Sequence, residues 1–237
     1  MGFYQELSRH YDEIFPARES EAAFVRQLLA GKKRLLDIGC GTGNKTAMLK
    51  TDPTENVTGI DADPAMVETA RRNHGNAGIS FLSLDMRDMI SVFSPGSFDS
   101  AVCLGNTLAH LTNPDELLEL FRQVRTILEP DGVFVAQMIN YNRIRTNQVD
   151  SLPVIETPNL VFTRRYEWRG GDMHFICTLR LKDGEEHHFD TILRPVLKAV
   201  LDGNLEEAGF GMIEYYGSFA GEPYDTDSYH TIFRAHA

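Results

Sequence analysis

The segment at positions 35–44, LLDIGCGTGN, restricts the possible folds more than any other feature of the chain. Its apolar run, which reaches Ile38, is typical of the end of a buried parallel strand. Glycine follows at alternate positions, and glycine permits the turns in which a backbone approaches a ligand closely. A helix can begin at Asn44. The segment therefore predicts strand, turn and helix in succession, the arrangement with which doubly wound sheets bind nucleotide-like molecules.

Strand-like and helix-like patterns alternate from position 33 to position 139. Such alternation predicts a parallel sheet with helices on both faces. Several of the expected helices carry apolar residues at helical spacing or begin at a proline. The expected strands are Lys33–Ile38, Asn56–Asp61, Ile79–Leu82, Phe98–Leu104 and Val133–Ile139, and the expected helices are Gln5–Phe15, Ala17–Leu29, Lys45–Lys50, one from Pro64, and Pro114–Leu128.

After position 140 the pattern changes to that of antiparallel strands. Apolar and polar residues alternate in three segments, and glycine-containing pairs between these segments favour hairpin turns. A helix and two further strands follow. The expected fold is α/β, a doubly wound, mostly parallel seven-stranded sheet with an antiparallel β-hairpin subdomain inserted after the fifth strand. The segments are Leu160–Trp168, Met173–Leu181 and His187–Leu193, followed by the helix Pro195–Ala208 and the strands Met212–Ser218 and Ser228–Ala235.

Composition excludes several classes of function. The formal net charge of -11 at pH 7 repels phosphate backbones, so nucleic acid is not an expected partner. Cys40, Cys103 and Cys177 lie far apart without a CxxC pair, which argues against a disulfide framework or a structural zinc. The N-terminus lacks an apolar signal core, and no run is long enough to span a bilayer. We therefore expect a cytoplasmic protein with reduced thiols and no membrane partner.

The residues around the glycine turn distinguish between nucleotide-like ligands. A dinucleotide fold requires G-x-G-x-x-G, and Asn44 stands where the third glycine would be needed. Asp37, immediately before the turn, would place a negative charge beside a pyrophosphate in a partly desolvated site. The same carboxylate suits a ligand with a cationic amino group. S-adenosylmethionine has an ammonium, a sulfonium and no phosphate, so the sequence favours it over a dinucleotide.

Four motifs in order resemble those of the class I S-adenosylmethionine-dependent methyltransferases. They are Leu36–Gly43, Gly59–Met66, Leu84–Met86 and Leu128–Phe134, and the resemblance covers about residues 35–135. It implies a Rossmann-like fold with S-adenosylmethionine as the methyl-donating cofactor.

The resemblance also implies roles for individual residues. Asp61 would accept hydrogen bonds from both ribose hydroxyls, although it could instead cap the following helix, for which Asp63 is better placed. Asp85 would meet the adenine amino group, and Met86 would pack on the ring unless it is ordinary core filler. The expected cofactor-binding residues are Tyr11, Asp37, Gly39, Cys40, Gly41, Asp61, Ala62, Met66, Asp85, Met86, Leu104 and Gly105.

The segment from Gly105 to Leu111, Gly-Asn-x-x-x-His-Leu, resembles glycine N-methyltransferase and related small-molecule N-methyltransferases. It implies a small-molecule acceptor, with nitrogen as the first choice for the attacked atom. His110 would orient the substrate or accept a proton, or else hydrogen-bond within its loop. Asn106 and Tyr141 are the other expected catalytic contacts. Tyr11 would belong to a lid over the cofactor or simply pack between helix and sheet.

The resemblance divides a single methyltransferase domain, residues 1–237, into four regions. These are an N-terminal helical lid at 1–31, a cofactor-binding core at 33–139, the antiparallel insertion at 140–195, and a C-terminal helix with two strands at 196–237.

Several questions stay open at the level of sequence. His187 and His188 point to opposite faces of a strand, so no metal site is expected. The aromatic set Phe162, Tyr166, Trp168 and Phe175 fits sheet packing best, but it also fits the wall of an acceptor pocket or the surface of a homodimer. An O- or C-methyltransferase and a non-catalytic cofactor-binding module are the alternatives to N-methyl transfer, and a nicotinamide oxidoreductase is a distant third.

Overall fold

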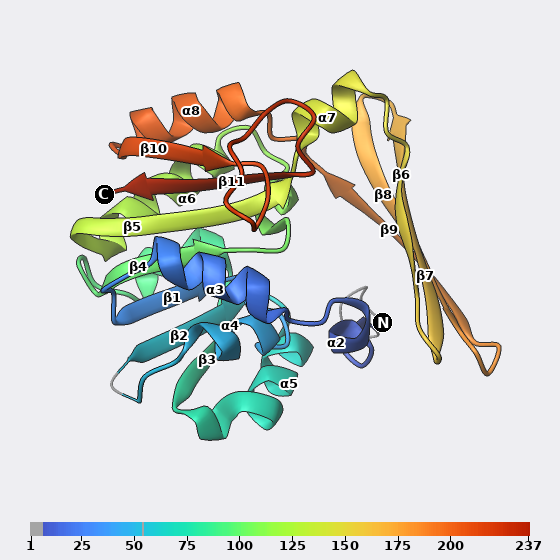
Figure 1. Ribbon diagram of the computed structural model, residues 1–237, viewed down its shortest axis with the longest axis horizontal. Helices are drawn as coiled ribbons and strands as arrows, with labels where there is room; N and C mark the ends of the chain where they lie inside the picture. The colour runs from blue at the N-terminus through green and yellow to red at the C-terminus, as the bar shows by residue number, and fades with distance from the viewer. Residues whose placement is uncertain (1–6, 54) are drawn as a thin grey trace.

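The computed structural model describes residues 7–53 and 55–237. It contains a seven-stranded sheet and a separate four-stranded sheet, which stand at opposite ends of the molecule in Figure 1. Of the helix expected at Gln5–Phe15, positions 5 and 6 lie outside the described residues. The remainder contains one short helix, α2 (Tyr11–Ile14), which lies between the two sheets.

The seven-stranded sheet has the strand order β10-β11-β5-β4-β1-β2-β3. Strands β1 to β5 are parallel, whereas β11 pairs antiparallel with both β5 and β10. The mostly parallel, seven-stranded sheet expected from the sequence is thereby confirmed. Its members are β1 (Arg34–Ile38), β2 (Asn56–Asp61), β3 (Ile79–Ser83), β4 (Phe98–Cys103), β5 (Leu128–Ile139), β10 (Gly211–Tyr216) and β11 (His230–His236).

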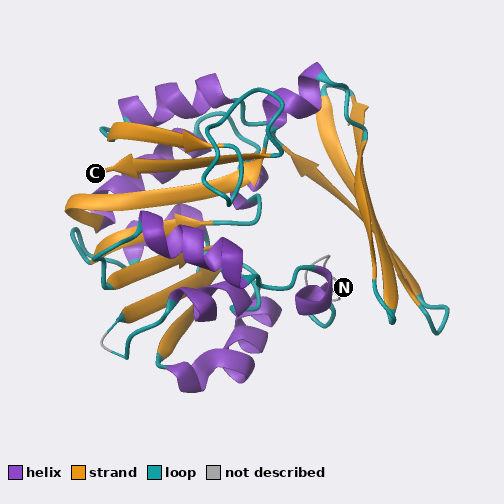
Figure 2. Cartoon of the chain, in the orientation of Figure 1, coloured by secondary structure: helices purple, strands orange, loops and turns teal. Residues whose placement is uncertain are grey.

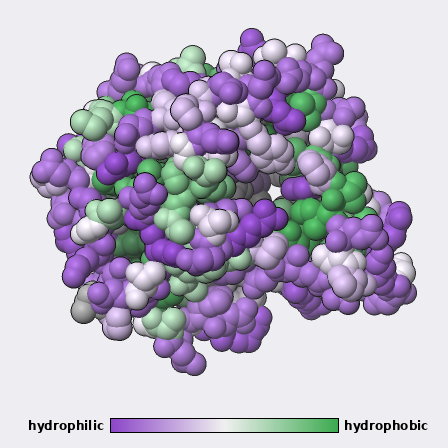
Figure 3. Space-filling view, viewed as in Figure 1, coloured by the Kyte–Doolittle hydropathy of each residue, from purple (hydrophilic) through white to green (hydrophobic). Residues whose placement is uncertain are grey.

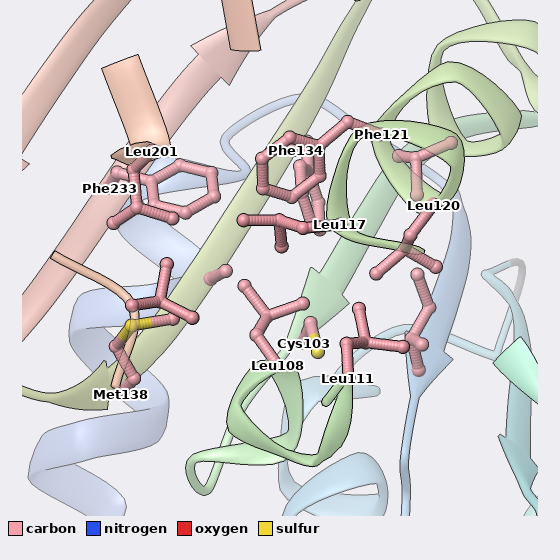
Figure 4. Close-up of a cluster of buried hydrophobic side chains, with 14 of the residues drawn as sticks. Cys103, Leu108, Leu111, Leu117, Leu120, Phe121, Phe134, Met138, Leu201 and Phe233 are labelled. Atoms are coloured by element: carbon pink, nitrogen blue, oxygen red, sulfur yellow. The ribbon is translucent and has the colours of Figure 1, made fainter. Parts of the chain in front are cut away.

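Helices cover both faces of this sheet (Figure 2), because the parallel strands are apolar on both sides. Along β1, Leu35 packs with α3, α4 and α5, whereas Leu36 packs with α6 and α8 on the opposite face. Figure 4 shows part of the cluster on the α6 and α8 face, in which Phe121 and Phe134 lie close together. The helices are α3 (Glu19–Leu28), α4 (Asn44–Leu49), α5 (Pro64–His74), α6 (Glu116–Ile127) and α8 (Lys198–Glu207), with 3-10 turns η1 (Gly75–Ala77), η2 (Met86–Ser91) and η3 (Thr107–His110).

The four-stranded sheet is antiparallel, in the order β6-β7-β8-β9. Three of its strands follow the sequence expectation, but the sequence pattern did not predict β6 or the helix α7 before it. Pro153 lies inside β6, and proline argues against a strand except at a sheet edge, which is where β6 lies. The elements are α7 (Tyr141–Thr146), β6 (Ser151–Glu156), β7 (Leu160–Arg169), β8 (Asp172–Leu181) and β9 (Glu186–Leu193).

The segment around α2 joins the two sheets. Ile14 belongs to a small hydrophobic cluster with the inner face of β7 and β8. On the other side, Asp12 accepts a hydrogen bond from the Thr42 hydroxyl, and the Asn44 amide donates to the Phe15 carbonyl at 3.0 Å. Because Thr42 and Asn44 follow β1, the α2 segment is fastened to the glycine turn as well as to the second sheet.

Candidate active site

The glycine turn after β1 has a backbone conformation and a close packing that side chains at Gly39 or Gly43 would disrupt. Gly39 and Gly43 have φ angles of 74° and 76°, in the left-handed region. A Cβ atom at Gly39 would lie 2.5 Å from Cγ2 of Thr107, and one at Gly43 would lie 2.7 Å from the Phe81 ring. The turn therefore packs closely against β3 and η3 while its main chain faces a cleft.

This cleft, the first cavity, has a volume of about 390 Å³ and lies at the carboxyl ends of β1 to β4. Ligands of open α/β sheets bind at this edge. Its lining comes from α2, the glycine turn, the ends of β2 and β3, and the segment after β4. The lining residues are Tyr11, Gly39, Gly41, Asp61, Ala62, Asp63, Pro64, Met66, Leu84, Asp85, Met86, Arg87, Gly105, Thr107, His110 and Leu111.

Asp61 ends β2 and ties two parts of the first cavity together. Its Oδ2 accepts a hydrogen bond from the Gly41 amide at 2.8 Å, and its Oδ1 accepts one from the Asp63 amide at 2.9 Å. Burial raises the pKa of Asp61, although these two hydrogen bonds lower it. Asp63, not Asp61, caps α5 by accepting from the amides of Ala65 and Met66, as expected. Each Asp61 oxygen retains lone-pair capacity for a ligand hydroxyl.

Asp85 is held by a neighbouring arginine. Its two oxygens accept from Arg87 Nε at 2.9 Å and Arg87 Nη2 at 2.6 Å, and the side chain also caps η2 through the Arg87 amide. The hydrogen bonds from Arg87 keep the pKa of Asp85 below its ordinary value. Arg87 in turn contacts Glu116 on α6 at 3.1 Å. Asp85 is thus ionised, with a fixed orientation at the edge of the first cavity.

Asp37 lies beneath the glycine turn and does not line the first cavity. It is 2% exposed, and its Oδ2 accepts a hydrogen bond from the Thr46 hydroxyl at 2.6 Å. Burial raises its pKa to about 6, partly offset by this hydrogen bond and by the charge of Lys45. The charge of Asp37 contributes to the raised pKa of Cys103 at the end of β4. Its electrostatic influence therefore extends across the sheet edge below the cleft.

A second cavity of about 230 Å³ adjoins the first. The two share Tyr11, Gly105 and His110, which we call the shared opening. The second cavity extends from the glycine-turn side to the inner face of the four-stranded sheet. Figure 3 shows hydrophobic side chains gathered over that sheet beside a hollow between the two lobes. Two bound molecules could therefore meet at the shared opening, one from each cavity.

Residues 35–132 match the family model described as a methyltransferase domain. The putative methyltransferase YqeM of Bacillus subtilis is 30% identical over 56% of this chain and 53% of its own length. Glycine/sarcosine N-methyltransferase of Halorhodospira halochloris is 26% identical over 95% of this chain and 84% of its own. An S-adenosylmethionine-dependent methyltransferase structure from Clostridium acetobutylicum superposes with a TM-score of 0.80 at 16% identity, covering 99% of both chains.

Residues 35–132 thus match a methyltransferase domain, and the chain as a whole has the fold of S-adenosylmethionine-dependent methyltransferases. It spans about half the length of the Bacillus relative. The residues of the first cavity fit the methyl donor. Asp61 has lone pairs for ribose hydroxyls, Asp85 is an ionised acceptor for an adenine amino group, and the turn from Gly39 to Gly43 leaves room for a ligand against its backbone.

The sequence-predicted cofactor residues divide into two groups in this methyltransferase domain. Most of them line the first cavity. The first cavity is not lined by Asp37, Cys40 or Leu104. Asp37 and Cys40 are buried under the turn, and Leu104, also buried, directly precedes Gly105 of the shared opening in the sequence. Direct contact of these three with the cofactor stays a prediction. The residues that line the cavity are Tyr11, Gly39, Gly41, Asp61, Ala62, Met66, Asp85, Met86 and Gly105.

The three predicted catalytic residues also differ in position. His110 lines both cavities, and burial lowers its pKa, so its imidazole is neutral near pH 7. Asn106 lines the second cavity only; its amide donates to the Tyr141 hydroxyl at 2.9 Å and accepts from the Ile139 amide at 3.2 Å. Tyr141 is 1% exposed and lines neither cavity. Asn106 and Tyr141 therefore fix the loop that carries His110, and their contact with substrate stays a prediction.

The sequence did not point to Arg164 as a functional residue of the second cavity, and it offered Tyr166 as a pocket wall only as an alternative to sheet packing. Both lie on the inner face of β7 and line that cavity. Arg164 donates to the Pro153 carbonyl at 2.8 Å and lies over the rings of Phe15 and Phe162. Among the described residues, its buried Nε and the hydroxyl of Tyr166 have no hydrogen-bond partner. The available signal was an arginine at an inward position of an otherwise apolar strand face.

Residues 7–53 and 55–237 contain neither a cluster of metal-binding side chains nor a membrane-spanning helix. No group of three or more histidine, cysteine, aspartate and glutamate side chains lies close enough to hold a metal ion. None of the helices there combines the length and the apolar character that crossing a membrane would require.

Proposed function

We propose that the protein methylates the nitrogen of a small amine that also carries a carboxylate or a similar anion. The observation that carries this proposal is the pair of unused donors on the wall of the second cavity. Arg164 has a buried Nε without a partner, and none of the described carboxylates forms an ion pair with it. A partly buried cation without a counter-ion is destabilising, and a ligand anion would reduce that cost.

Tyr166 supports the same assignment. Its side chain is 6% exposed, its ring centroid lies 5.4 Å from that of Phe175 with the rings tilted by 34°, and its hydroxyl is unpartnered among the described residues. Burial raises its pKa well above the ordinary value, so the hydroxyl stays protonated and acts as a donor. Arg164 and Tyr166 are two positions apart on one strand, so both side chains face the same way. Together they form a donor pair suited to two oxygens of one anion.

The anion and the attacked atom are separate groups in this arrangement. The donor pair belongs to the four-stranded sheet, whereas the shared opening belongs to the glycine-turn side of the second cavity. An acceptor bound by its anion on Arg164 would therefore present a different atom at Gly105 and His110. Nitrogen is our choice for that atom, consistent with the resemblance of the Gly105–Leu111 segment and with the N-methyltransferase relative.

The residues then have defined tasks. S-adenosylmethionine supplies a methyl group on a sulfonium, whose carbon is open to in-line attack. The acceptor nitrogen gives its lone pair to that carbon, the carbon–sulfur bond breaks with its electrons going to sulfur, and the nitrogen then loses one proton to water. The protein contributes mainly by holding the nucleophile in line. Neutral His110 can orient the nitrogen by a hydrogen bond, and the apolar walls of the second cavity favour the neutral amine.

Matched acceptor pairs test this proposal. Purified protein would be incubated with deuterium-labelled methyl donor and with amino acids or their primary amides, and products would be identified by mass spectrometry. We expect methylated nitrogen from the acids only, and Arg164→Leu should raise their KM about hundredfold by removing the counter-charge. Arg165→Leu is the matched control, because Arg165 is exposed on the opposite face of β7. Equal turnover of acids and amides would contradict the anion, and a methyl ester would contradict nitrogen.

A homodimer, a cytoplasmic location and the four regions 1–31, 33–139, 140–195 and 196–237 belong to the same proposal. The three cysteines are buried and unpaired, which supports a reducing compartment. Light scattering on the purified chain tests the dimer, and a single species at monomer mass would contradict it.

A further inference from the structure

Three groups at the boundary of the two cavities form a short chain of hydrogen bonds. The Gly105 amide donates to Oε1 of Gln137 at 2.9 Å, and Nε2 of Gln137 lies 3.0 Å from Nδ1 of His230. Gln137 is 5% exposed on β5, and all three residues line the second cavity. Gly105 also belongs to the shared opening, so these hydrogen bonds lead from the first cavity into the second.

The Gly105 amide determines which group donates and which accepts in each of these hydrogen bonds. A backbone amide can only donate, so the oxygen of Gln137 must face Gly105. The NH₂ group of Gln137 must then face His230 and donate to it. A ring nitrogen that receives a hydrogen bond carries no proton itself, so Nδ1 of His230 is the acceptor. The proton of the neutral imidazole is therefore on Nε2.

The surroundings of His230 keep its imidazole neutral. Burial lowers its pKa to about 4, and the positive charge of Lys45 on α4 acts in the same direction. The rings of Phe219 and Tyr229 pack edge-on against it at 5.3 and 4.8 Å. The only described carboxylate that lines the second cavity is that of Glu21 on α3. With Nδ1 engaged and Nε2 protonated, His230 has no free lone pair near pH 7 and cannot serve as the base.

We propose that Gln137 is a positioning residue that holds His230 as a fixed neutral donor, whose Nε2–H binds an oxygen of the methyl acceptor. The oxygen follows from the chemistry of transfer, because a hydrogen bond donated to the attacking nitrogen would occupy the lone pair that must reach the methyl carbon. The acceptor thus belongs to the amines that carry a carbonyl, hydroxyl or carboxylate oxygen near the nitrogen. This substrate class and the contact of His230 with an acceptor oxygen rest on the proposed function, whereas the role of Gln137 in fixing the tautomer of His230 does not.

The tautomer of His230 can be measured directly. Long-range 15N NMR of histidine-labelled protein distinguishes a protonated Nε2 from a protonated Nδ1, and loss of one signal set in His230→Gln assigns the ring among the eight histidines. We expect Nε2–H in the native protein, without titration between pH 5.5 and pH 8. A protonated Nδ1, or titration near the ordinary histidine value, would overturn the proposal. Neither measurement requires a methyl acceptor, so this outcome is independent of the proposed function.

Gln137→Glu provides the sharper perturbation. Its carboxylate can still accept from the Gly105 amide but can no longer donate to His230, so the histidine must donate instead. We expect the pKa of His230 to rise by about two units or more, with Nδ1 protonated. Gln137→Met is the matched control, because it removes both hydrogen bonds and leaves His230 in a tautomer mixture. An unchanged Nε2–H tautomer in folded Gln137→Glu would show that Gln137 does not set it.

Binding and kinetics separate a positioning role from a merely structural one. Calorimetry with S-adenosylhomocysteine should give Gln137→Glu the native affinity, since the contact to Gly105 persists. With any acceptor that the native enzyme turns over, His230→Phe should raise the acceptor KM at least tenfold. His230→Gln keeps a hydrogen-bond donor at this position, so its acceptor KM should lie close to that of the native enzyme. If these His230 variants change the affinity for S-adenosylhomocysteine and leave the acceptor KM unchanged, then His230 contacts the methyl donor. That result would overturn the assignment of an acceptor oxygen.

Discussion

We expect Asp37 to make binding of the methyl donor sensitive to pH. In the free protein its pKa is about 6, because burial opposes ionisation more strongly than Thr46 and Lys45 support it. If the ammonium of the donor lies close to Asp37, as the sequence predicts, binding favours the ionised carboxylate. A pKa that returns to its ordinary value on binding makes the affinity at pH 5 about tenfold, or about 1.4 kcal/mol, weaker than at pH 7. The loss should increase about tenfold per pH unit between pH 6 and the pKa of the complex.

Calorimetric titration from pH 7.5 to pH 5 measures this effect, with S-adenosylhomocysteine as the ligand. Burial also raises the pKa of Asp61, so a second ligand is needed as a control. 5′-Methylthioadenosine has the adenine and ribose but lacks the amino-acid end, so its pH dependence reports Asp61 and Asp85 only. The difference between the two ligands is the contribution of Asp37, and Asp37→Asn should abolish that difference. Parallel curves for both ligands, or an unchanged difference in Asp37→Asn, would refute the reasoning.

Three further variants test the described packing. Tyr166→Phe should raise the free energy of unfolding by about 1 kcal/mol, because an unsatisfied buried hydroxyl is removed, while raising the acceptor KM; lower stability in urea denaturation would argue against this account. Gly43→Ala should lower the free energy of unfolding by about 2 kcal/mol, because its φ is 76° and its Cβ would meet the Phe81 ring, and a neutral effect would contradict the turn geometry. Asp63→Ala should cost about 1 kcal/mol by removing the α5 cap, and Asp63→Asn should restore most of it.

Most of the residues that line the first cavity could be predicted because their determinants are local. The glycine turn follows β1, Asp61 ends β2 and Asp85 lies two residues after β3, and the carboxyl ends of parallel strands meet at one edge of the sheet. Asp63 as a helix cap was predicted for the same reason, since a cap and its amides lie within three residues. Asp37 shows the limit of such reasoning, because a strand residue beside the turn faces into the protein as readily as toward a ligand.

The acceptor half depends on contacts between distant segments. Arg164 lines the second cavity only because β7 lies across from the shared opening. One of its hydrogen bonds goes to the carbonyl of Pro153 on β6, a strand that the sequence did not predict. Gln137 and His230 are separated by more than ninety residues and meet only through the pairing of β5 with β11. No periodicity within one strand indicates such a pair. The side chains that would choose the acceptor are therefore those least visible in the sequence.

The α2 segment links the two halves of the site physically. Tyr11 belongs to the shared opening, while Phe15 forms part of the second-cavity wall beside Arg164. The same segment is fastened to the glycine turn through Thr42 and Asn44. We therefore expect any rearrangement of the turn on binding of the methyl donor to move residues that line the second cavity. If so, the shape of the second cavity depends on what occupies the first, and acceptor affinity should be measured with S-adenosylhomocysteine present as well as absent.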